Sequence, residues 1–451
     1  MEERNEREKK KRTRRLGTAA RAALLLLALP FALGTKACER DLDPIIFVHG
    51  GSGSGAQFET QAMRFTSNGY PASRIRVLEY DSSAISTILP DVLARLDALI
   101  AELQAETGRT QVELIGHSLG TFVSQTYLST PARAANVAHY VNVDGRAASA
   151  PPGGVPTLAL WAGAIPRSPQ PEITGATNVL VPDQEHIEVA VSEESFVEMY
   201  RFFRGHPPLT SKILPEIRSQ ISGRVTSFPQ NTGLDGATLE IWRVDGDTGE
   251  RTGSGPVATY AIGADGDFGP FTAWLGKHYE LAVTREGEVS LHYYYEPFLR
   301  SDHLVRLNVA LGLAPFISSS DAHVALTVLR FKEFWGDRGA ANDVLAIDGI
   351  DVINPTTAPS GAVGLASSAF FLFDVGSDGA SNLTNVPFPF SALPFLTAAD
   401  LFIPSQPPRT ITVTTVPRGD AGATRVVNVP SLPSNEARVV VQLNDFEQDF
   451  H

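Results

Sequence analysis

Residues Gly116–Phe122 read GHSLGTF and contain the one G-x-S-x-G pattern of the chain, with Ser118 at its centre. The apolar run before it, QVELIG, has the character of a β-strand, and residues 121–128 after it have helical spacing. Glycines at the first and last positions of the pattern permit a sharp turn and let the helix pack close to the strand. A strained turn of this kind lifts a serine hydroxyl clear of its neighbours, so the context indicates a nucleophile elbow rather than an ordinary glycine-rich turn.

Strand-like and helix-like signals alternate from residue 44 to residue 203. Apolar runs of strand length occupy 44–50, 75–81, 137–145, 157–163 and 176–182, and helical spacing occupies 89–105 and 191–203. Such alternation predicts a mostly parallel sheet with helices on both of its faces.

The alternation of strand and helix patterns ends near residue 207, and the segment 207–220 has the composition of a linker. From 221 to 307, polar and apolar residues alternate between turn signals such as VDGDTGE, which is typical of a small β-sandwich domain. Residues 308–451 form a second β-rich stretch with no clean repeat of the first. The sequence therefore predicts an α/β domain over 39–206, followed by a β-rich C-terminal half of one or two β-sandwich domains.

The 451 residues are enough for two or three domains, and 43% hydrophobic with 19% charged residues indicates a globular protein. The net charge of −13 conceals an asymmetry. Residues 1–37 carry ten Lys/Arg and four Asp/Glu, which leaves a net charge of −19 on the rest of the chain. Such an acidic bulk argues against nucleic acid as a partner.

Residues 1–38 have the pattern of a signal peptide. A basic run precedes a short apolar stretch at 22–33, too short to span a bilayer comfortably. We therefore expect a secreted or periplasmic protein, with a single N-terminal membrane anchor as the alternative. Cys38 is the only cysteine, which excludes an intrachain disulfide and leaves lipid attachment open, although the residues before it match a lipoprotein signal poorly.

A nucleophilic serine needs a general base, and the base needs an orienting acid. After such an elbow the expected chain order is serine, acid, histidine. Of the histidines that follow in the α/β region, His139 lies in mid-strand and His206 lies at the boundary with the linker. His186 follows the last strand of the domain, where it can reach back over the strand ends. It is therefore the predicted base.

The acid has more than one candidate. Asp144 directly follows the strand at 137–143, and the active-site groups of open α/β sheets lie at the carboxyl ends of strands. Asp144 is the predicted acid, with a turn role as the alternative because Asp-Gly is a common turn dipeptide. Glu172 is the second candidate acid. Asp183 is not a first choice for the acid because it lies very near His186 in the sequence.

The glycine-rich stretch HGGSGSGAQF, His49–Phe58, follows the first strand. Its backbone N–H groups can approach a substrate closely. We expect the N–H groups of Gly51 and of Leu119, the residue after the nucleophile, to point at a developing oxyanion. A phosphate-binding loop is excluded because no Gly-Lys-Ser/Thr follows and the spacing is not G-x-G-x-x-G.

Taken together, the segments IIFVHGGSGSGAQFETQAMRFTSNGYP, LIGHSLGTF, VNVDG, NVLVPDQEH and VVVQLNDFE resemble the α/β-hydrolase lipases that carry a C-terminal β-domain, a family with an archaeal long-chain lipase as a known member. The resemblance runs over most of the mature chain and implies the α/β-hydrolase fold. It implies Ser118 as nucleophile, Asp144 as acid and His186 as base. It also implies Gly51 and Leu119 as oxyanion donors, and a β-domain that helps to engage lipid substrate.

One feature departs from this family. Such lipases carry a helical lid inserted after the strand that ends in Tyr-Asp, whereas here Tyr80-Asp81 is followed only by SSAISTI before a helix expected near Pro90. A lid of two helices does not fit into this connection. We therefore expect a site that is open in water, without interfacial activation.

The stretch 383–404 holds Phe388, Phe390 and Phe395 among prolines, which disfavour a central strand. One interpretation is a surface apolar loop that binds substrate beside the cleft, and the other is packing between the two halves of the chain. The Asp-Gly-Asp turns at 245–247 and 265–267 are more typical of hairpins than of calcium sites, so we expect no metal site.

These patterns predict a serine ester hydrolase, a lipase or carboxylesterase, that cleaves acylglycerols or other apolar esters through an acyl-enzyme without a cofactor. Peripheral contact with a lipid surface fits the same interpretation. An extracellular polyester depolymerase is the alternative within the enzyme class. A catalytically silent lipid- or carbohydrate-binding envelope protein is the alternative outside it, although the complete order of serine, acid and histidine argues against silence.

Overall fold

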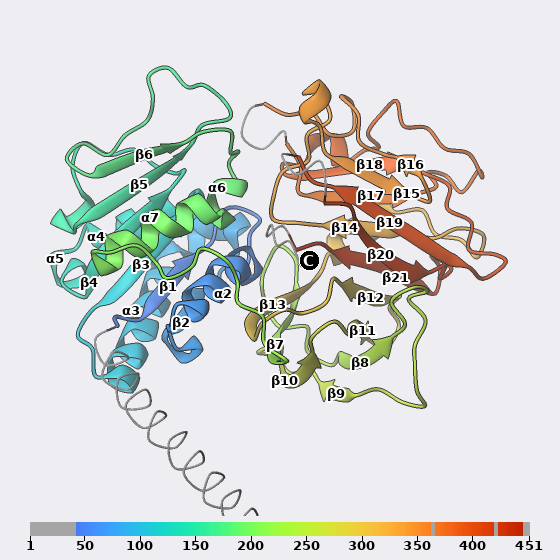
Figure 1. Cartoon of the computed structure of the whole chain (residues 1–451), viewed down its shortest axis with the longest axis horizontal. Coiled ribbons are helices and arrows are strands. Elements are labelled where there is room, and N and C mark those ends of the chain that lie inside the picture. The colour runs from blue at the N-terminus through green and yellow to red at the C-terminus, as the bar shows by residue number, and fades with distance from the viewer. Residues whose placement is uncertain (1–41, 362–365, 419–422, 445–451) are drawn as a thin grey trace, which may run out of the picture.

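The computed structural model describes residues 42–361, 366–418 and 423–444. An α/β domain, blue to green in Figure 1, lies beside a β-rich half, yellow-green to red. The predicted targeting segment 1–38, with Cys38, lies outside the described residues.

The α/β domain is built on a six-stranded sheet in the order β2-β1-β3-β4-β5-β6, with every pair parallel. Its strands are β1 Ile45–Val48, β2 Ile75–Leu78, β3 Val112–His117, β4 Val137–Val143, β5 Thr157–Ala162 and β6 Thr177–Val181. Its helices are α2 Glu59–Ser67, α3 Ile85–Thr107, α4 Leu119–Leu128, α5 Pro131–Ala134, α6 Glu188–Val191 and α7 Glu193–Arg204, with 3-10 turns η1 Gly55–Phe58, η2 Ala72–Arg74, η3 Ser82–Ala84 and η4 Pro152–Gly154. The predicted α/β-hydrolase sheet is confirmed.

Helices cover both faces of this sheet. In β1, Ile45 and Phe47 join the apolar core formed with α2 and α7, whereas Ile46 and Val48 join the core formed with α3 and α4. All four side chains are fully buried. A strand buried on both faces reads as a continuous apolar run, which is why IIFV is a strong strand signal in the sequence.

The connection between β2 and α3 is short, as the sequence predicts. Asp81 caps η3 by accepting a hydrogen bond from the backbone N–H of Ser83, and α3 begins at Ile85. No helical lid is inserted at this point of the described chain.

The β-rich half contains three sheets within the described residues. Their strands are β7 Arg218–Ser227, β8 Thr238–Val244, β9 Ala258–Ala261, β10 Asp267–Trp274, β11 His278–Thr284, β12 Ser290–Tyr295, β13 Asp302–Val309, β14 Leu326–Leu329, β15 Val344–Ile347, β16 Ile350–Asp351, β17 Ala369–Phe373, β18 Leu396–Asp400, β19 Thr410–Val416, β20 Arg425–Pro430 and β21 Ala437–Gln442, with 3-10 turns η5 Leu311–Phe316, η6 Gly339–Ala341 and η7 Phe390–Ala392. The sheets run β10-β7-β13, β16-β15-β19-β20 and β18-β17-β14-β21-β12-β11-β8-β9.

The eight-stranded sheet joins the two stretches that the sequence separates at residue 307. β21 lies between β12 and β14 and pairs in parallel with both, so residues on either side of that boundary share one sheet. The segment 207–220 is also partly strand, because β7 begins at Arg218.

The two faces of the eight-stranded sheet have different partners. One face packs on the four-stranded sheet, with Val439 and Val441 of β21 in that core. The other face packs on the three-stranded sheet at its β8, β11 and β12 end, with Val440 in that second core. At its β14 and β17 end, the second face lines the cavity described below, together with residues of the α/β domain.

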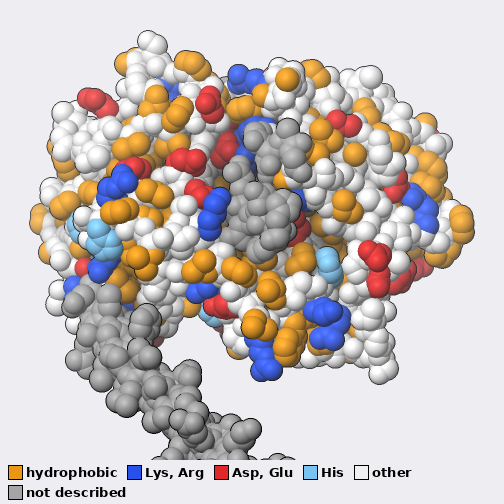
Figure 2. Space-filling model, in the orientation of Figure 1, with side chains coloured by type: hydrophobic (Ala, Val, Ile, Leu, Met, Phe, Trp, Pro, Cys, Tyr) orange, Lys and Arg blue, Asp and Glu red, His pale blue; other side chains and the backbone are white. Residues whose placement is uncertain are grey.

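Buried polar contacts join the two halves. Arg306 of β13 donates to Glu79 after β2 at 2.7 Å, and Asn231 donates from its amide to the carbonyl oxygens of Gly53 and Tyr80 at 2.8 and 3.1 Å. On the face shown in Figure 2, acidic and basic side chains stand close together near this junction. The glycine-rich loop after β1 is therefore held partly by the β-rich half.

The turn between β3 and α4 depends on one glycine. A Cβ atom at Gly120 would lie 2.2 Å from the carbonyl oxygen of Val48 and 2.6 Å from that of His49. Both are backbone atoms of the neighbouring strand and its extension, so they cannot move aside independently. Glycine is needed for α4 to approach β1 this closely.

We expect Gly120→Ala to lower the free energy of unfolding by about 1–3 kcal/mol or more, because overpacking against backbone cannot relax by a rotamer change. Gly255→Ala is the matched control, since a Cβ there meets no atom within 4 Å. Chemical denaturation measures both. Equal stability of the two variants would contradict the close approach of α4 to β1.

Candidate active site

Ser118 occupies the elbow between β3 and α4. Its backbone has φ 51° and ψ −120°, a conformation that L-residues rarely adopt outside strained functional turns. The backbone N–H of Ser118 donates to Val143 at 3.0 Å, and its carbonyl oxygen accepts from the backbone N–H and hydroxyl of Thr121 at 2.9 and 2.7 Å. These bonds hold the strained turn in place. The Ser118 side chain is half-buried and lines a cavity.

Asp144 and His186 meet at the carboxyl end of the sheet. Asp144 follows β4, and its Oδ2 lies 2.7 Å from Nδ1 of His186, which follows β6. Both residues are buried, with 4% and 5% of their surface exposed. Nε2 of His186 is buried and has no hydrogen-bond partner among the described residues. Because Nδ1–H donates to Asp144, Nε2 is the free acceptor on the ring.

Two further groups contact the Asp144 carboxylate. Oδ1 accepts from the backbone N–H of Ala162 at 2.9 Å and from the Arg167 guanidinium at 2.5 Å. Burial raises the pKa of Asp144, but the bonds and charges of His186, Arg167 and the Ala162 N–H outweigh it, so the pKa lies below its usual value. Asp144 is therefore held as a carboxylate. Arg167 is a site residue that the sequence analysis missed, because nothing in its local pattern marks it.

His117, inside the G-x-S-x-G pattern, supports the loop that carries His186. Gln57 donates from its amide to Nδ1 of His117 at 2.7 Å, and Nε2–H of His117 donates to the carbonyl oxygen of His186 at 2.8 Å. Burial and the nearby His186 lower the pKa of His117 to about 3, so the ring stays neutral. It acts as a fixed donor that positions the backbone of His186.

The two predicted oxyanion donors lie on adjoining segments. Gly51 follows β1, and a Cβ atom on it would lie 4.0 Å from the Leu119 side chain at the start of α4. Gly51 lines the same cavity as Ser118. The loop is held by the bond from the backbone N–H of Ser52 to the Ser82 hydroxyl at 2.8 Å. Gly50 of this loop lies directly beside the serine, because a Cβ atom on it would be 3.0 Å from the Cβ of Ser118.

A cavity of about 330 Å³ connects these groups to the β-rich half. From the α/β domain it is lined by Gly51, Ser118 and His186. From the second face of the eight-stranded sheet it is lined by Leu291, Thr327, Leu329, Ala369, Phe371, Leu396, Arg438, Val440 and Gln442. The lining is mainly apolar, which is the usual character of a small-molecule site.

The three phenylalanines of 383–404 occupy different environments. Phe395 lines the cavity, and its ring stacks on that of His186 with centroids 5.9 Å apart. Phe390 is 1% exposed and packs against Phe371 and Phe373, whereas Phe388 is 72% exposed. The interpretation of all three as one surface loop at the cleft is corrected, because Phe390 belongs to an apolar core and β18 begins directly after Phe395.

The loop that carries His186 is tied to the β-rich half by a carboxylate. Glu333 accepts hydrogen bonds from the backbone N–H groups of Ile187 and Glu188, the latter at 3.2 Å, directly after the histidine. Burial raises the pKa of Glu333, while Arg418 and the Ile187 N–H oppose this. Sequence reasoning had no means of finding Glu333, since it lies almost 150 residues from the loop that it binds.

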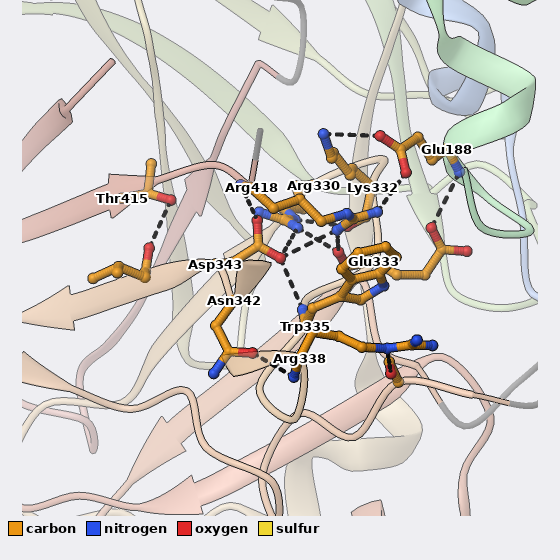
Figure 3. Close-up of polar contacts among 12 residues, drawn as sticks. Glu188, Arg330, Lys332, Glu333, Trp335, Arg338, Asn342, Asp343, Thr415 and Arg418 are labelled. Carbon is orange, nitrogen blue, oxygen red and sulfur yellow. Dashed lines mark hydrogen bonds and ion pairs between the residues drawn. The ribbon is translucent and has the colours of Figure 1, made fainter. Parts of the chain in front are cut away.

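Figure 3 shows the ion pairs around this contact. Glu188, the first residue of α6, pairs with Lys332 at 2.8 Å and with Arg418 at 2.5 Å. Arg418 also pairs with Asp343 at 3.1 Å, and Arg330 pairs with the same carboxylate at 3.0 Å. All of these side chains are largely buried, so removing one partner would leave an uncompensated charge.

The remaining candidate acid and histidines do not line this cavity. Glu172 is exposed, and the Thr174 hydroxyl donates to it at 3.2 Å. His139 pairs with Glu113 at 2.9 Å, and His206 is exposed after α7. In the 245–247 turn, Asp245 accepts from the backbone N–H of Asp247, as in an ordinary Asx turn.

No helix among the described residues combines the length and the apolar composition that a bilayer crossing needs. They also contain no grouping of three or more His, Cys, Asp or Glu side chains that could hold a metal ion.

The fold and the elbow define this chain as an α/β hydrolase with an added β-rich half. Family models agree: residues 42–132 match the model described as Lipase (class 2), residues 218–311 match the one described as Lipase C-terminal domain, and residues 312–447 match a further C-terminal domain model. The predicted resemblance to a lipase with a C-terminal domain is confirmed. The archaeal relationship stays a prediction.

Among curated proteins no match was found. The chain is similar to several solved structures at low identity. One is a lipase of Bacillus licheniformis in propeptide form, 11% identical over 86% of this chain and 93% of that one, with a TM-score of 0.29. A gene product of Listeria innocua is 14% identical over 38% of this chain and 97% of that one (TM-score 0.29), and a predicted hydrolase of Thermoplasma acidophilum is 16% identical over 35% and 84% (TM-score 0.26).

The phenylalanines can be separated by single substitutions. We expect Phe390→Ser to destabilise the fold by about 3–5 kcal/mol, as truncation of a buried phenylalanine does. Phe395→Ser should instead lower activity on long-chain esters more than on p-nitrophenyl acetate, with a small change in Tm. Phe388→Ser, at an exposed ring, is the control for the change in Tm alone. A large fall in Tm for Phe395→Ser alone would assign that ring to the core.

We expect Glu333→Gln to lower kcat for a soluble ester about tenfold or more, with little change in KM. An amide nitrogen cannot accept a hydrogen bond, so one buried N–H of the loop loses its partner and the histidine shifts. Glu436→Gln, at an exposed acid of the same half, is the control. An unchanged kcat for Glu333→Gln would mean that the loop holds its position without this carboxylate.

Proposed function

We propose that this protein is a serine ester hydrolase that cleaves apolar carboxylic esters, acylglycerols among them. The observation that carries the proposal is the strained Ser118 elbow in one cavity with a buried Asp144–His186 pair. The lipase family models support hydrolase chemistry on apolar substrates. No cofactor enters the proposed reaction.

In this reaction the hydroxyl oxygen of Ser118 attacks the ester carbonyl carbon while Nε2 of His186 takes the hydroxyl proton. Nδ1–H stays bonded to Asp144, whose charge stabilises the imidazolium. The proton on Nε2 then passes to the leaving alcohol as the ester C–O bond breaks. Water attacks the acyl-enzyme with His186 again as base, which releases the acid and restores the serine.

The N–H groups of Gly51 and Leu119 would stabilise the negative charge that develops on the carbonyl oxygen. The loop that carries Gly51 is restrained by Asn231, whose amide donates to Gly53 at 2.8 Å. Donors fixed before the reaction cost no reorganisation when charge appears. The β-rich half would therefore help to preorganise the oxyanion site as well as the histidine.

We propose that substrate is presented at a lipid surface by an apolar rim on the β-rich half. Leu311, Phe316 and Phe388 are 38%, 44% and 72% exposed, and the Phe316 and Phe388 rings meet edge to face at 6.0 Å. Leu311 also lines the cavity, so this rim adjoins the substrate site. Exposed apolar side chains grouped beside a cavity are typical of lipid or ligand contact. Export through the 1–38 segment would bring the enzyme to such surfaces.

We expect Ser118→Ala and His186→Ala each to lower kcat on p-nitrophenyl butyrate by about four orders of magnitude or more, because triad members act as a unit. Asp144→Asn should cost about a hundredfold or more, because the ring loses its orienting charge. Glu172→Gln is the matched control and should stay near wild type.

Fluorophosphonate labelling followed by mass spectrometry would locate the nucleophile. A label on Ser118 that is lost in His186→Ala supports the mechanism. An unlabelled but folded wild type would favour the silent binding scaffold. Loss of activity in Glu172→Gln with a normal Asp144→Asn would move the acid to the loop after β5.

A further inference from the structure

The cavity beside Ser118 has a cationic lining. Three arginines line it, Arg306, Arg330 and Arg438, against one acid, Glu288. Arg306 is paired with Glu79 at 2.7 Å, and Arg330 is paired with Asp343 at 3.0 Å. Within the described chain, Arg438 has no carboxylate at ion-pair distance.

Arg438 stands on the sheet face that lines the cavity. β21 pairs Arg438 with Leu291 of β12, and Val440 and Gln442 follow at alternate positions on the same face. All four residues line the cavity. The guanidinium is therefore set among apolar neighbours rather than in open solvent.

The described residues satisfy little of the hydrogen-bonding capacity of this guanidinium. One bond joins its Nη2 to the carbonyl oxygen of Ala314 at 3.3 Å, and its Nε is buried with no hydrogen-bond partner. Burial is the cause that lowers the pKa of Arg438, and no facing acid opposes it. Arginine remains protonated in proteins, so the cavity holds a fixed charge for which the described residues supply no carboxylate partner.

The acid in the lining does not supply the missing partner. Glu288 pairs with Arg285 at 3.0 Å in the turn between β11 and β12. A desolvated charge without a partner is unfavourable, and proteins generally pair such groups. An anionic ligand group in the cavity would supply the missing partner.

We propose that the cavity accepts esters that bear a second, free carboxylate, and that Arg438 binds this carboxylate while Ser118 attacks the ester. A planar guanidinium matches a single carboxylate with two parallel N–H···O bonds. The inference rests on the proposed ester hydrolase function and narrows its substrate class. Half-esters of dicarboxylic acids and short oligoesters with an acid end have this chemistry, and partial hydrolysis of a polyester supplies them.

The reaction itself is unchanged. Water adds across the ester: the C–O bond breaks, the acyl carbon gains the hydroxyl group and the alcohol gains the proton. The product is a dicarboxylate, one end of which still faces Arg438.

The test compares two matched series of p-nitrophenyl esters on the full chain. One series has methyl-ended acyl groups, hexanoate, octanoate and decanoate. The other has the carboxylate-ended monoesters of adipic, suberic and sebacic acids. For each chain length, the ratio compares kcat/KM for the carboxylate-ended ester with kcat/KM for the methyl-ended ester. We expect this ratio to fall at least about tenfold in Arg438→Met, because KM for the carboxylate-ended ester rises. Methyl-ended esters should be cleaved as well as before or better. The chain length with the highest ratio would measure the distance from the serine to the guanidinium.

Three controls keep the outcome clear. Arg438→Lys keeps the charge and should retain part of the preference, which also covers a failure of Arg438→Met to fold. Arg243→Met removes an exposed arginine from β8, outside the cavity lining, and should leave the ratio unchanged. In the wild type, the preference should weaken as ionic strength rises.

Equal ratios in wild type and Arg438→Met would overturn the proposal. A preference for a monoacyl phosphate-bearing lipid over the half-esters would overturn it in favour of a phosphate site. Failure of the proposed function is distinguishable, because wild type would then hydrolyse neither series or Ser118→Ala would remain active.

Discussion

The contact on which this structure most depends joins the Glu333 carboxylate to the two peptide N–H groups after His186. It joins parts of the chain that are far apart in sequence, and it fixes the backbone directly after His186. Ion pairs between Glu188 and the cations of the β-rich half surround it, and the histidine loop is held from the other side by His117. His186 is thus held by both halves at once, and the cavity beside it is lined by residues of both halves.

The β-rich half also shapes the cavity beside Ser118. An α/β-hydrolase sheet presents its serine at an open edge, and in this chain no helical insertion after β2 covers that edge. The second face of the eight-stranded sheet covers it instead, with side chains that alternate along β21 between the cavity and the core behind it. The shape of this side of the cavity therefore depends on the side chains at a few alternate positions of the sheet.

Much of the α/β domain could be predicted from the sequence, because doubly covered strands such as IIFV read as continuous apolar runs and because the Ser118 elbow carries its own glycines. The order of serine, acid and histidine led to Asp144 and His186, which the structure brings together at 2.7 Å. Arg167, Glu333, Arg418 and Arg438 could not be found this way, since each matters only through a partner distant in the sequence. The burial of Phe390 and the exposure of Phe388, two residues apart, likewise follow from tertiary packing that no local pattern encodes.

The placement of β21 also governs when the site can come into being during synthesis. β21 lies in the interior of its sheet and pairs in parallel with strands that begin about 150 and 110 residues earlier, so the sheet stays divided until residues 437–442 have left the ribosome. The α/β domain, whose contacts are more local, can collapse long before then. Until the late strand arrives, the wall of the cavity is absent and the support of the histidine loop is incomplete. The chain is therefore built so that the candidate site is completed only late in folding.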